Sequence, residues 1–345
     1  MLLKKIILRD LFNQRKRKRN KTVYQTYQYI KRFVLYLQNE KYMFDLRYIT
    51  PEIIKEYVEK IKRNDITKNY LFSVLKKVER FLHEVHIAGY DIDLSEYQKI
   101  LSVSYAERKA EAEANKIPNI PKRIFNQVIR CALSDIEDES LRLQDRMIAC
   151  LIVILSHTGM RKGELQRLEA DKLRDITILN KKEKAYILEF FTYKTTSTKD
   201  GRWTKSIAFP ETVIAYQKLE ELSQERRKIG NTTFLFLNKF GKRYSKSSFD
   251  YLFDGFFYRH QNELFSSLSD YEKAQVHETK VGSFLMTSIG LNTPKTPIKG
   301  ETIITLNPHQ FRVAVANILK NKVNLQWIRE HMNHLDEEMT KHYFR

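Results

Sequence analysis

The sequence predicts a mainly α-helical protein with two domains, the second of which includes a small antiparallel sheet. In the first third of the chain, apolar residues recur at three- and four-residue spacing, as on one face of an amphipathic helix. Two prolines at 115–121 interrupt this pattern, because proline biases the residue before it away from helix. Two strand-like segments, 185–193 and 204–209, later flank the turn signal Asp200-Gly201.

The first domain is expected to be a bundle of four amphipathic helices. Thr50 suits a helix N-cap and Pro51 the first helical position, whereas Gly89 suits a helix end. Lys and Arg are spread over the exposed positions of these segments. The expected helices span residues 22–39, 51–61, 67–87 and 94–114.

The domain boundaries follow from the prolines and from a run of basic residues. The segment RKRKRNK at 15–21 is typical of a solvated face, and it could also lie along phosphates. Pro118 and Pro121 mark the best linker in the chain. We therefore expect an N-terminal extension at 1–14, a helical domain at 15–114, a linker at 115–121 and a second domain at 122–345.

The second domain is expected to begin with a helix near Lys122. A strongly apolar helix at 146–157 follows and ends at Gly159. After the two strands the pattern returns to helix, and Asn307-Pro308 provides an N-cap and a first-turn proline for a later helix. Residues 240–306 give no clear assignment.

Composition and charge narrow the class of partner. Among 345 residues, 61 Lys and Arg exceed 42 Asp and Glu, a net charge of +19 that favours a nucleic-acid partner over a merely Lys-rich protein. Cys131 and Cys150 lie in apolar helical contexts, which favours core residues in a reducing compartment over a disulfide. No apolar stretch approaches the roughly 20 residues that span a bilayer. We expect a cytoplasmic protein without a membrane partner.

Four motifs carry the chemistry, and their order along the chain matters. Arg161 lies just after Gly159, at a helix-turn-helix corner, with Glu164 close enough to orient it. A lysine, Lys194, follows the first strand. The remaining two motifs are a His-x-x-Arg pair that shares one helix face and a histidine nine residues before a tyrosine; they comprise His309, Arg312, His334 and Tyr343.

Together these motifs resemble the tyrosine recombinase (phage integrase) family. That family places, in this order, an arginine in a TGxRxxEL-like corner, a hairpin lysine, an H-x-x-R helix, a second histidine and a tyrosine nine residues later. The resemblance covers 120–345 by motif and implies six catalytic residues with one supporting residue: Arg161, Lys194, His309, Arg312, His334 and the nucleophile Tyr343, supported by Glu164. For 15–115 it rests on architecture alone, and it implies a SAM-like helical domain that binds the DNA core site.

The chemistry explains why these residue types are needed. Attack on a phosphodiester develops charge on the non-bridging oxygens, so catalysis depends on positioning and electrostatic stabilisation. Arg161 and Arg312 can clamp those oxygens with paired hydrogen bonds. A tyrosine hydroxyl has an ordinary pKa of about 10, so it needs a base or nearby cations to react. The resemblance implies that His309 is the base, His334 a phosphate donor and Lys194 the acid for the leaving 5′-oxygen.

The resemblance also implies the wider function and its partners. We expect a site-specific recombinase that cleaves and rejoins double-stranded DNA through a 3′-phosphotyrosine, as a homo-tetramer on two DNA sites. It would integrate or excise a phage or conjugative transposon, with accessory DNA-bending or directionality factors as further partners. No cofactor or metal is expected. The alternatives are a type IB topoisomerase-like DNA relaxing enzyme, which would act on plasmid without a cognate site, and a non-catalytic DNA-binding repressor, which would form no covalent adduct.

Some individual assignments had competing interpretations. A zinc site at His331, His334 and His342 would lack both a Cys pair and a His-Glu-x-x-His pattern. Lys199 and Lys205 share the hairpin with Lys194 and are alternative proton donors. Asn333 stands where the family usually has Gly and Phe311 where it often has Leu. His157 matches no family position, and we interpret it as structural.

Overall fold

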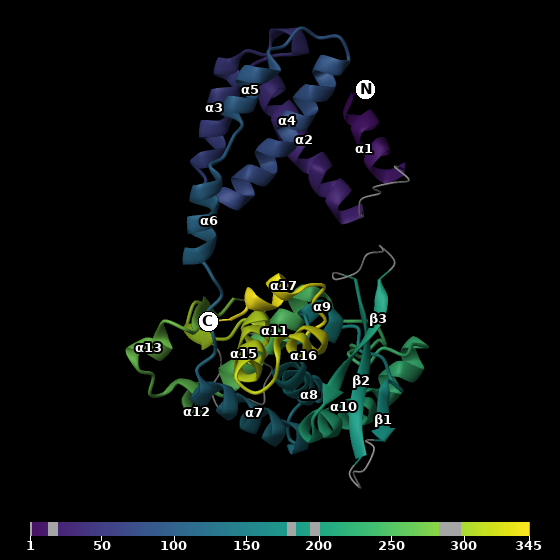
Figure 1. Ribbon diagram of the computed structural model, residues 1–345. Helices are drawn as coiled ribbons and strands as arrows, with labels where there is room; N and C mark the ends of the chain where they lie inside the picture. The colour runs from purple at the N-terminus through teal and green to yellow at the C-terminus, as the bar shows by residue number, and fades with distance from the viewer. Residues whose placement is uncertain (1, 13–19, 178–183, 194–200, 283–297, 345) are drawn as a thin grey trace. The chain divides into compact units, whose positions relative to one another are not determined.

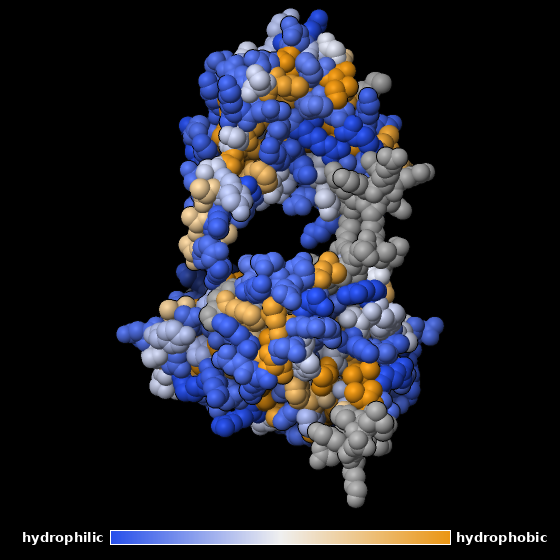
Figure 2. Space-filling view, in the orientation of Figure 1, coloured by the Kyte–Doolittle hydropathy of each residue, from blue (hydrophilic) through white to orange (hydrophobic). Residues whose placement is uncertain are grey.

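The computed structural model describes residues 2–12, 20–177, 184–193, 201–282 and 298–344 (Figure 1). The chain forms two compact units, residues 1–116 and 117–345. None of the described helices is both long and apolar enough to cross a membrane. The face of each unit that Figure 2 shows is mainly hydrophilic, with hydrophobic residues in smaller groups.

The first unit is entirely helical, and its helices pack around one apolar core. Ile30, Phe33, Ile54, Leu75 and Leu82 are fully buried in this core. Its elements are α1 (Leu2–Phe12), α2 (Asn20–Glu40), a 3₁₀ turn (Leu46–Tyr48), α3 (Pro51–Lys62), α4 (Lys68–Ile87), α5 (Leu94–Ile100) and α6 (Tyr105–Ala114).

Two parts of this unit differ from the sequence prediction. The segment expected as an N-terminal extension forms α1, which packs on α2 and α4 and pairs Asp10 with Arg80 at 2.6 Å. The prediction of a single helix at 94–114 is wrong, because the structure has two helices there, α5 and α6. The break follows from Ser104, whose hydroxyl accepts a hydrogen bond from the Glu107 N–H and so starts a new helix.

The second unit is built around α8 (Leu143–Thr158), which is contacted by four other helices and by a strand (Figure 1). The side chains from Met147 to Leu155 are all fully buried, as expected for a helix that is apolar on every side. The helices around it include α7 (Lys122–Glu137), α10 (Pro210–Gly230), α11 (Lys246–Arg259) and α15 (Pro308–Lys320). The shorter helices are α9 (Lys162–Leu165), α12 (Gln261–Phe265), α13 (Asp270–Lys273), α16 (Leu325–His331) and α17 (Glu337–Lys341).

Two small antiparallel sheets complete the second unit. Strands β1 (Leu173–Thr177), β2 (Lys184–Thr192) and β3 (Arg202–Ala208) form the first sheet, with β2 in the centre. Strands β4 (His277–Lys280) and β5 (Thr302–Thr305) form the second, inside the region that gave no assignment from sequence. The predicted fold class, mainly helical with a small antiparallel sheet, is thereby confirmed. The basic run at 15–21 and residues 283–297 of the unassigned region lie largely outside the described residues.

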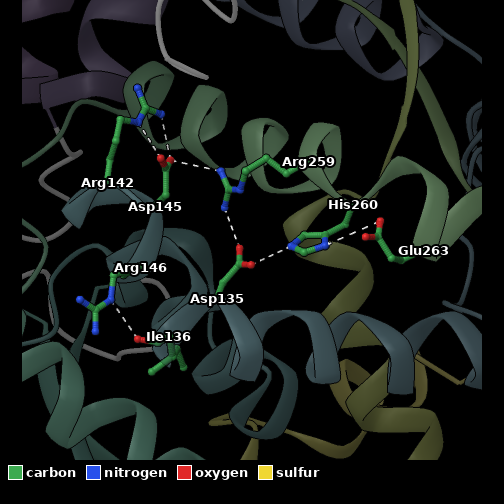
Figure 3. A network of polar contacts seen from close by, with 8 residues as sticks. All are labelled: Asp135, Ile136, Arg142, Asp145, Arg146, Arg259, His260 and Glu263. Carbon is green, nitrogen blue, oxygen red and sulfur yellow. Dashed lines mark hydrogen bonds and ion pairs between the residues drawn. The ribbon is translucent and has the colours of Figure 1, made fainter. Parts of the chain in front are cut away.

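A buried network of charges joins three helices of the second unit (Figure 3). Arg259 of α11 pairs with Asp135 of α7 at 2.8 Å and with Asp145 of α8 at 3.2 Å. His260 contacts Asp135 at 2.9 Å, and Arg142 contacts Asp145 at 2.6 Å. Removing one member of a buried ion pair leaves an uncompensated charge, so the network favours a single packing of α7, α8 and α11.

The protonation of His260 links this network to pH. Burial alone would lower the pKa of His260, but the hydrogen bond with Asp135, together with the effect of the neighbouring Cys131, outweighs burial and raises the pKa to about 9, from 6.5. A group whose pKa is raised by folding stabilises the native state fully below its unfolded pKa, and the stabilisation is lost as pH rises through its folded pKa.

We therefore expect the second unit to lose stability between about pH 6.5 and pH 9, by roughly 3 kcal/mol. Both tryptophans, Trp203 and Trp327, lie in this unit, so urea unfolding followed by tryptophan fluorescence reports on it. The variant His260→Gln should be less stable at pH 6 and should show a flatter profile. An equal decline in both proteins would contradict the assignment to His260.

Candidate active site

The corner that carries Arg161 is set by the end of α8. Gly159 has φ of 60°, the left-handed conformation that ends many helices. Arg161 follows as the N-cap of α9, and its backbone N–H donates to Glu164 Oε2 at 2.8 Å. Its guanidinium also donates to Glu164 Oε1 at 3.0 Å. Glu164 therefore fixes both the backbone and the side chain of Arg161.

Strand β2 reinforces this corner through Thr192. The Thr192 hydroxyl donates to Glu164 Oε1 at 2.6 Å, and both residues are buried. The same carboxylate oxygen thus accepts hydrogen bonds from Thr192 and Arg161. This connection ties the end of the hairpin strand to the arginine corner.

Arg312 of α15 is buried, with 1% of its surface exposed, and two helix ends hold it. Its Nη1 donates to the carbonyl of Gly159 at 2.5 Å, and its Nη2 donates to the carbonyl of Met332. These carbonyls lie at the C-terminal ends of α8 and α16, where helix dipoles favour positive charge. Arginine has five N–H donors, so donors remain for a ligand.

The two arginines raise the positive potential of the site. Burial, and then the charge of Arg161, lower the pKa of Arg312 to about 10. Arg312 stays protonated at neutral pH, because that value is still far above 7. Two guanidiniums that disfavour each other are stabilised by a bound anion, and paired arginine hydrogen bonds match the oxygens of a phosphate.

Tyr343 lies against three of the predicted residues. Its ring is stacked on His334 at 5.1 Å with an interplanar angle of 11°, and it lies 5.5 Å from the His309 ring. The guanidinium carbon of Arg312 is 5.3 Å from its centroid. Asn317 holds the Tyr343 carbonyl with a 2.9 Å hydrogen bond. The tyrosine itself is mostly enclosed, with 8% of its surface exposed.

His334 is held as a neutral ring. Its Nδ1 forms a 2.9 Å hydrogen bond with the Thr340 hydroxyl. Burial, followed by the charges of Arg312 and Arg161, lowers the pKa of His334 to about 2. Its Nε2 is buried and has no hydrogen-bond partner among the described residues. A neutral imidazole can present that nitrogen to a ligand without adding charge.

The backbone conformation of Asn333 directs the chain toward the site at His334. Asn333 has φ of 53°, in the left-handed region that Gly adopts easily and Asn tolerates better than most residues. This conformation accounts for Asn in place of the glycine usual in the family. Its side chain also accepts a 2.8 Å hydrogen bond from Arg202 of β3.

The structure thus brings together most of the residues singled out from sequence. Arg161 and Glu164 share one corner, and this corner adjoins a cluster formed by His309, Arg312, His334 and Tyr343. Lys194 lies outside the described residues, as does Lys199. Lys205 is exposed on β3, paired in register with Glu189.

Two other histidines near the site contact the backbone and a neighbouring ring. His157 Nδ1 forms a hydrogen bond with the carbonyl of Val153 at 2.9 Å, within α8. His331 stacks on Trp327 and contacts the His157 carbonyl at 3.0 Å. Within the described part of the chain, no three His, Cys, Asp or Glu side chains group as metal ligands.

Sequence reasoning missed three residues that support the site. Thr192, Arg202 and Thr340 each bond to one of the predicted residues or to its neighbour. Their residue types are common on any surface. Only the strand register, which pairs Thr192 with Arg202, places two of them at the same end of the hairpin.

Comparisons with known proteins bear on the fold. No protein-family profile matches the sequence, and no curated protein matches it. Among solved structures, XerH site-specific recombinase bound to palindromic difH substrate aligns with a TM-score of 0.54 and 14% identity, over 99% of this chain and 79% of that chain. The Tn1549 transposon integrase in complex with transposon right end DNA aligns with a TM-score of 0.55 and 15% identity, over 100% of this chain and 95% of that chain. A lambda integrase tetramer bound to a Holliday junction aligns with a TM-score of 0.53 and 12% identity, over 100% of this chain and 76% of that chain.

These three proteins are tyrosine recombinases. The chain therefore has the tyrosine recombinase fold, and the resemblance inferred from its motifs is confirmed at the level of the fold.

A substitution at Gly159 tests the corner. An L-residue in the left-handed conformation costs roughly 1–2 kcal/mol, so Gly159→Ala should lower the unfolding free energy of the second unit by about that amount. A Cβ there would also lie 3.4 Å from Met332 and Val315. Tryptophan-monitored urea unfolding is the measurement.

Gly163→Ala is the matched control. Gly163 lies in α9, and a Cβ there would meet nothing within 4 Å. Alanine favours helix over glycine by about 1 kcal/mol, so this variant should be neutral or stabilised. Equal destabilisation by both substitutions would show that the conformation of Gly159 is not the cause.

Proposed function

We propose that this chain is a site-specific DNA recombinase that cleaves and rejoins strands through a 3′-phosphotyrosine at Tyr343. The observation that carries the proposal is the enclosure of the Tyr343 ring by His334, His309 and Arg312, at 5.1, 5.5 and 5.3 Å. A tyrosine in the core of a protein needs no such neighbours. The tyrosine recombinase fold and the net charge of +19 support the same conclusion.

The phosphate would bind between the two arginines. Arg312 is positioned by backbone carbonyls and not by a carboxylate, so its charge is not cancelled by a counter-ion on those contacts. Arg161 keeps one carboxylate partner, Glu164, which orients it. Both guanidiniums would bind the non-bridging oxygens as charge develops on them. The buried Nε2 of His334 would add a neutral donor in the tautomer that carries its proton there.

The reaction exchanges one phosphodiester for another. The Tyr343 oxygen attacks phosphorus, a bond from phosphorus to that oxygen forms, and the bond to the 5′-oxygen breaks. His309, whose ring adjoins Tyr343, would accept the tyrosine proton. Lys194 would donate a proton to the leaving 5′-oxygen, as the family resemblance implies. The reverse sequence with another 5′-oxygen rejoins the strand.

The proposed assembly and biological role are drawn by analogy with the structural neighbours. The lambda integrase compared above is a tetramer on a Holliday junction, and the Tn1549 integrase is bound to transposon end DNA. By analogy, four copies of this chain would act on two double-stranded DNA sites and move a phage or conjugative transposon. Residues 15–114 would bind the core site, and residues 122–345 would carry out cleavage.

The covalent adduct is the direct test. The full chain is incubated with a library of randomised DNA duplexes, and complexes that survive SDS are recovered and sequenced. We expect a defined set of sequences and a phosphotyrosine peptide at Tyr343 by mass spectrometry. Tyr343→Phe should form no adduct, because it lacks the attacking oxygen.

Tyr271→Phe is the control, because Tyr271 is 67% exposed on α13. Adducts from Tyr343→Phe, or a phosphopeptide at another residue, would contradict the nucleophile assignment. Adducts on all sequences would indicate a DNA relaxing enzyme. Binding without any adduct would indicate a non-catalytic DNA-binding protein.

The Thr192–Glu164 contact gives a second prediction. Thr192→Val removes the hydroxyl while keeping the volume, which should loosen Glu164 and with it Arg161. A hydrogen bond to a charged group is worth enough to slow cleavage about tenfold. The measurement is the single-turnover cleavage rate on a duplex recovered from the library.

A modified substrate tests whether Thr192 acts by positioning Arg161 or only by supporting the structure. A methylphosphonate at the cleaved position replaces one charged oxygen with a neutral methyl group, so it depends less on the arginine charges. Thr192→Val should lose less rate on this substrate, and Thr192→Ser, which keeps a hydroxyl, should restore the rate on normal DNA. An equal loss on both substrates would mean that Thr192 is merely structural.

A further inference from the structure

The end of the β2–β3 hairpin has two faces with different chemistry. Thr192 and Arg202 are paired in the strand register and reach Glu164 and Asn333 of the site. Successive side chains of a strand alternate between faces, so the next pair, Phe191 and Trp203, lies on the opposite face. The function proposed above uses only the first face.

The second face carries a cluster of aromatic rings. Phe191 packs edge-to-face on Tyr193 at 4.8 Å and on Trp203 at 5.5 Å. Trp203 is 47% exposed and Tyr193 is 39% exposed. Gly201 makes this packing possible, because a Cβ at that position would lie 2.4 Å from the Phe191 ring. Large aromatic surface left exposed and fixed in place is typical of a binding surface.

Two cations accompany the exposed rings. Lys172 Nζ lies 4.3 Å from the Trp203 centroid, and the Arg167 guanidinium lies 4.8 Å from that of Tyr193. Glu189, the nearby carboxylate on β2, is paired with Arg174 at 3.4 Å. Positive charge beside an open aromatic surface complements a partner that offers both phosphates and planar rings.

We propose that the face formed by Phe191, Tyr193 and Trp203 binds an unpaired DNA base by stacking, with Lys172 and Arg167 on the adjoining phosphates. A base inside a duplex has both its flat surfaces covered by neighbouring bases, so only an unpaired base can stack on Trp203. Strand exchange requires bases to unpair beside the cleaved phosphate. The hairpin end that carries this face also contacts Glu164, which holds Arg161.

This inference rests on the proposed function for the presence of DNA, but its test needs no cleavage. In the full chain with Trp327→Phe, Trp203 is the sole tryptophan. Its fluorescence is followed while two DNA duplexes are added separately, one fully paired and one identical except for a central loop of unpaired thymines. Stacking should quench Trp203 with the looped duplex and leave it nearly unchanged with the paired one.

Measurements of DNA affinity provide a second test of the same proposal. By anisotropy of labelled DNA, Trp203→Ala should weaken binding of the looped duplex about tenfold, the loss of one base–aromatic stack, and leave the paired duplex unaffected. Phe240→Ala is the matched control, because Phe240 is 64% exposed with Lys239 over its ring at 5.1 Å. It should change neither affinity.

Each other outcome overturns the inference in a distinguishable way. Equal quenching by both duplexes, or equal loss of affinity for both in Trp203→Ala, would mean that this face does not select an unpaired base. Binding of both duplexes without quenching would place Trp203 outside the interface. Failure to bind either DNA would overturn the proposed function as well.

Discussion

The site depends on how the chain buries one guanidinium. Placing the charge of Arg312 in the interior costs free energy, because water no longer solvates it. Among the described residues, the direct contacts that offset this cost are the carbonyls at two helix ends. These contacts have a chemical consequence, because helix dipoles stabilise the guanidinium without cancelling its full charge. Arg312 therefore joins α8, α15 and α16 and keeps the charge that the proposed function would use to bind a phosphate.

Two left-handed residues make this arrangement possible. Gly159 itself supplies one of the carbonyls that bind Arg312, and Asn333 directly follows Met332, which supplies the other. Each ends a helix and turns the chain toward the site, the first to Arg161 and the second to His334. The same conformation that terminates a helix thus delivers a functional side chain one or two residues later.

Much of this could be predicted from sequence because it depends on local rules. The apolar run before Gly159 identifies α8 and its end, Asn307-Pro308 identifies the start of α15, and the nine-residue spacing identifies Tyr343. The division of 94–114 into α5 and α6 was missed, because the capping of a new helix by Ser104 competes weakly with a continuous apolar pattern. Strands β1, β4 and β5 were missed because short strands depend on partners distant in the chain.

The contacts that orient the site were the least predictable part. Thr192 reaches Glu164 across 28 residues of sequence, and Arg202 reaches Asn333 across 131. Neither pair has a spacing rule, because the strand register and the packing of β3 against α16 bring them together. Motif reasoning therefore finds the groups that the proposed function uses, whereas the groups that hold them follow only from the tertiary fold.

The charges around Tyr343 limit the chemistry that the cluster of His309, Arg312, His334 and Tyr343 could perform. His334 is neutral, so the positive charge beside Tyr343 comes from Arg161 and Arg312, and Glu164 compensates one of them. Among the described residues of the cluster, this leaves a net positive charge that would match one phosphodiester in the proposed function. In the proposed reaction, the further negative charge that develops during attack would be met by proton transfer to His309 and to the leaving oxygen. The hydrogen bond from Thr192 of β2 to Glu164 ties the end of this strand to Arg161. In the proposed function, that strand leads in sequence to the proton donor Lys194, and Arg161 would bind the phosphate.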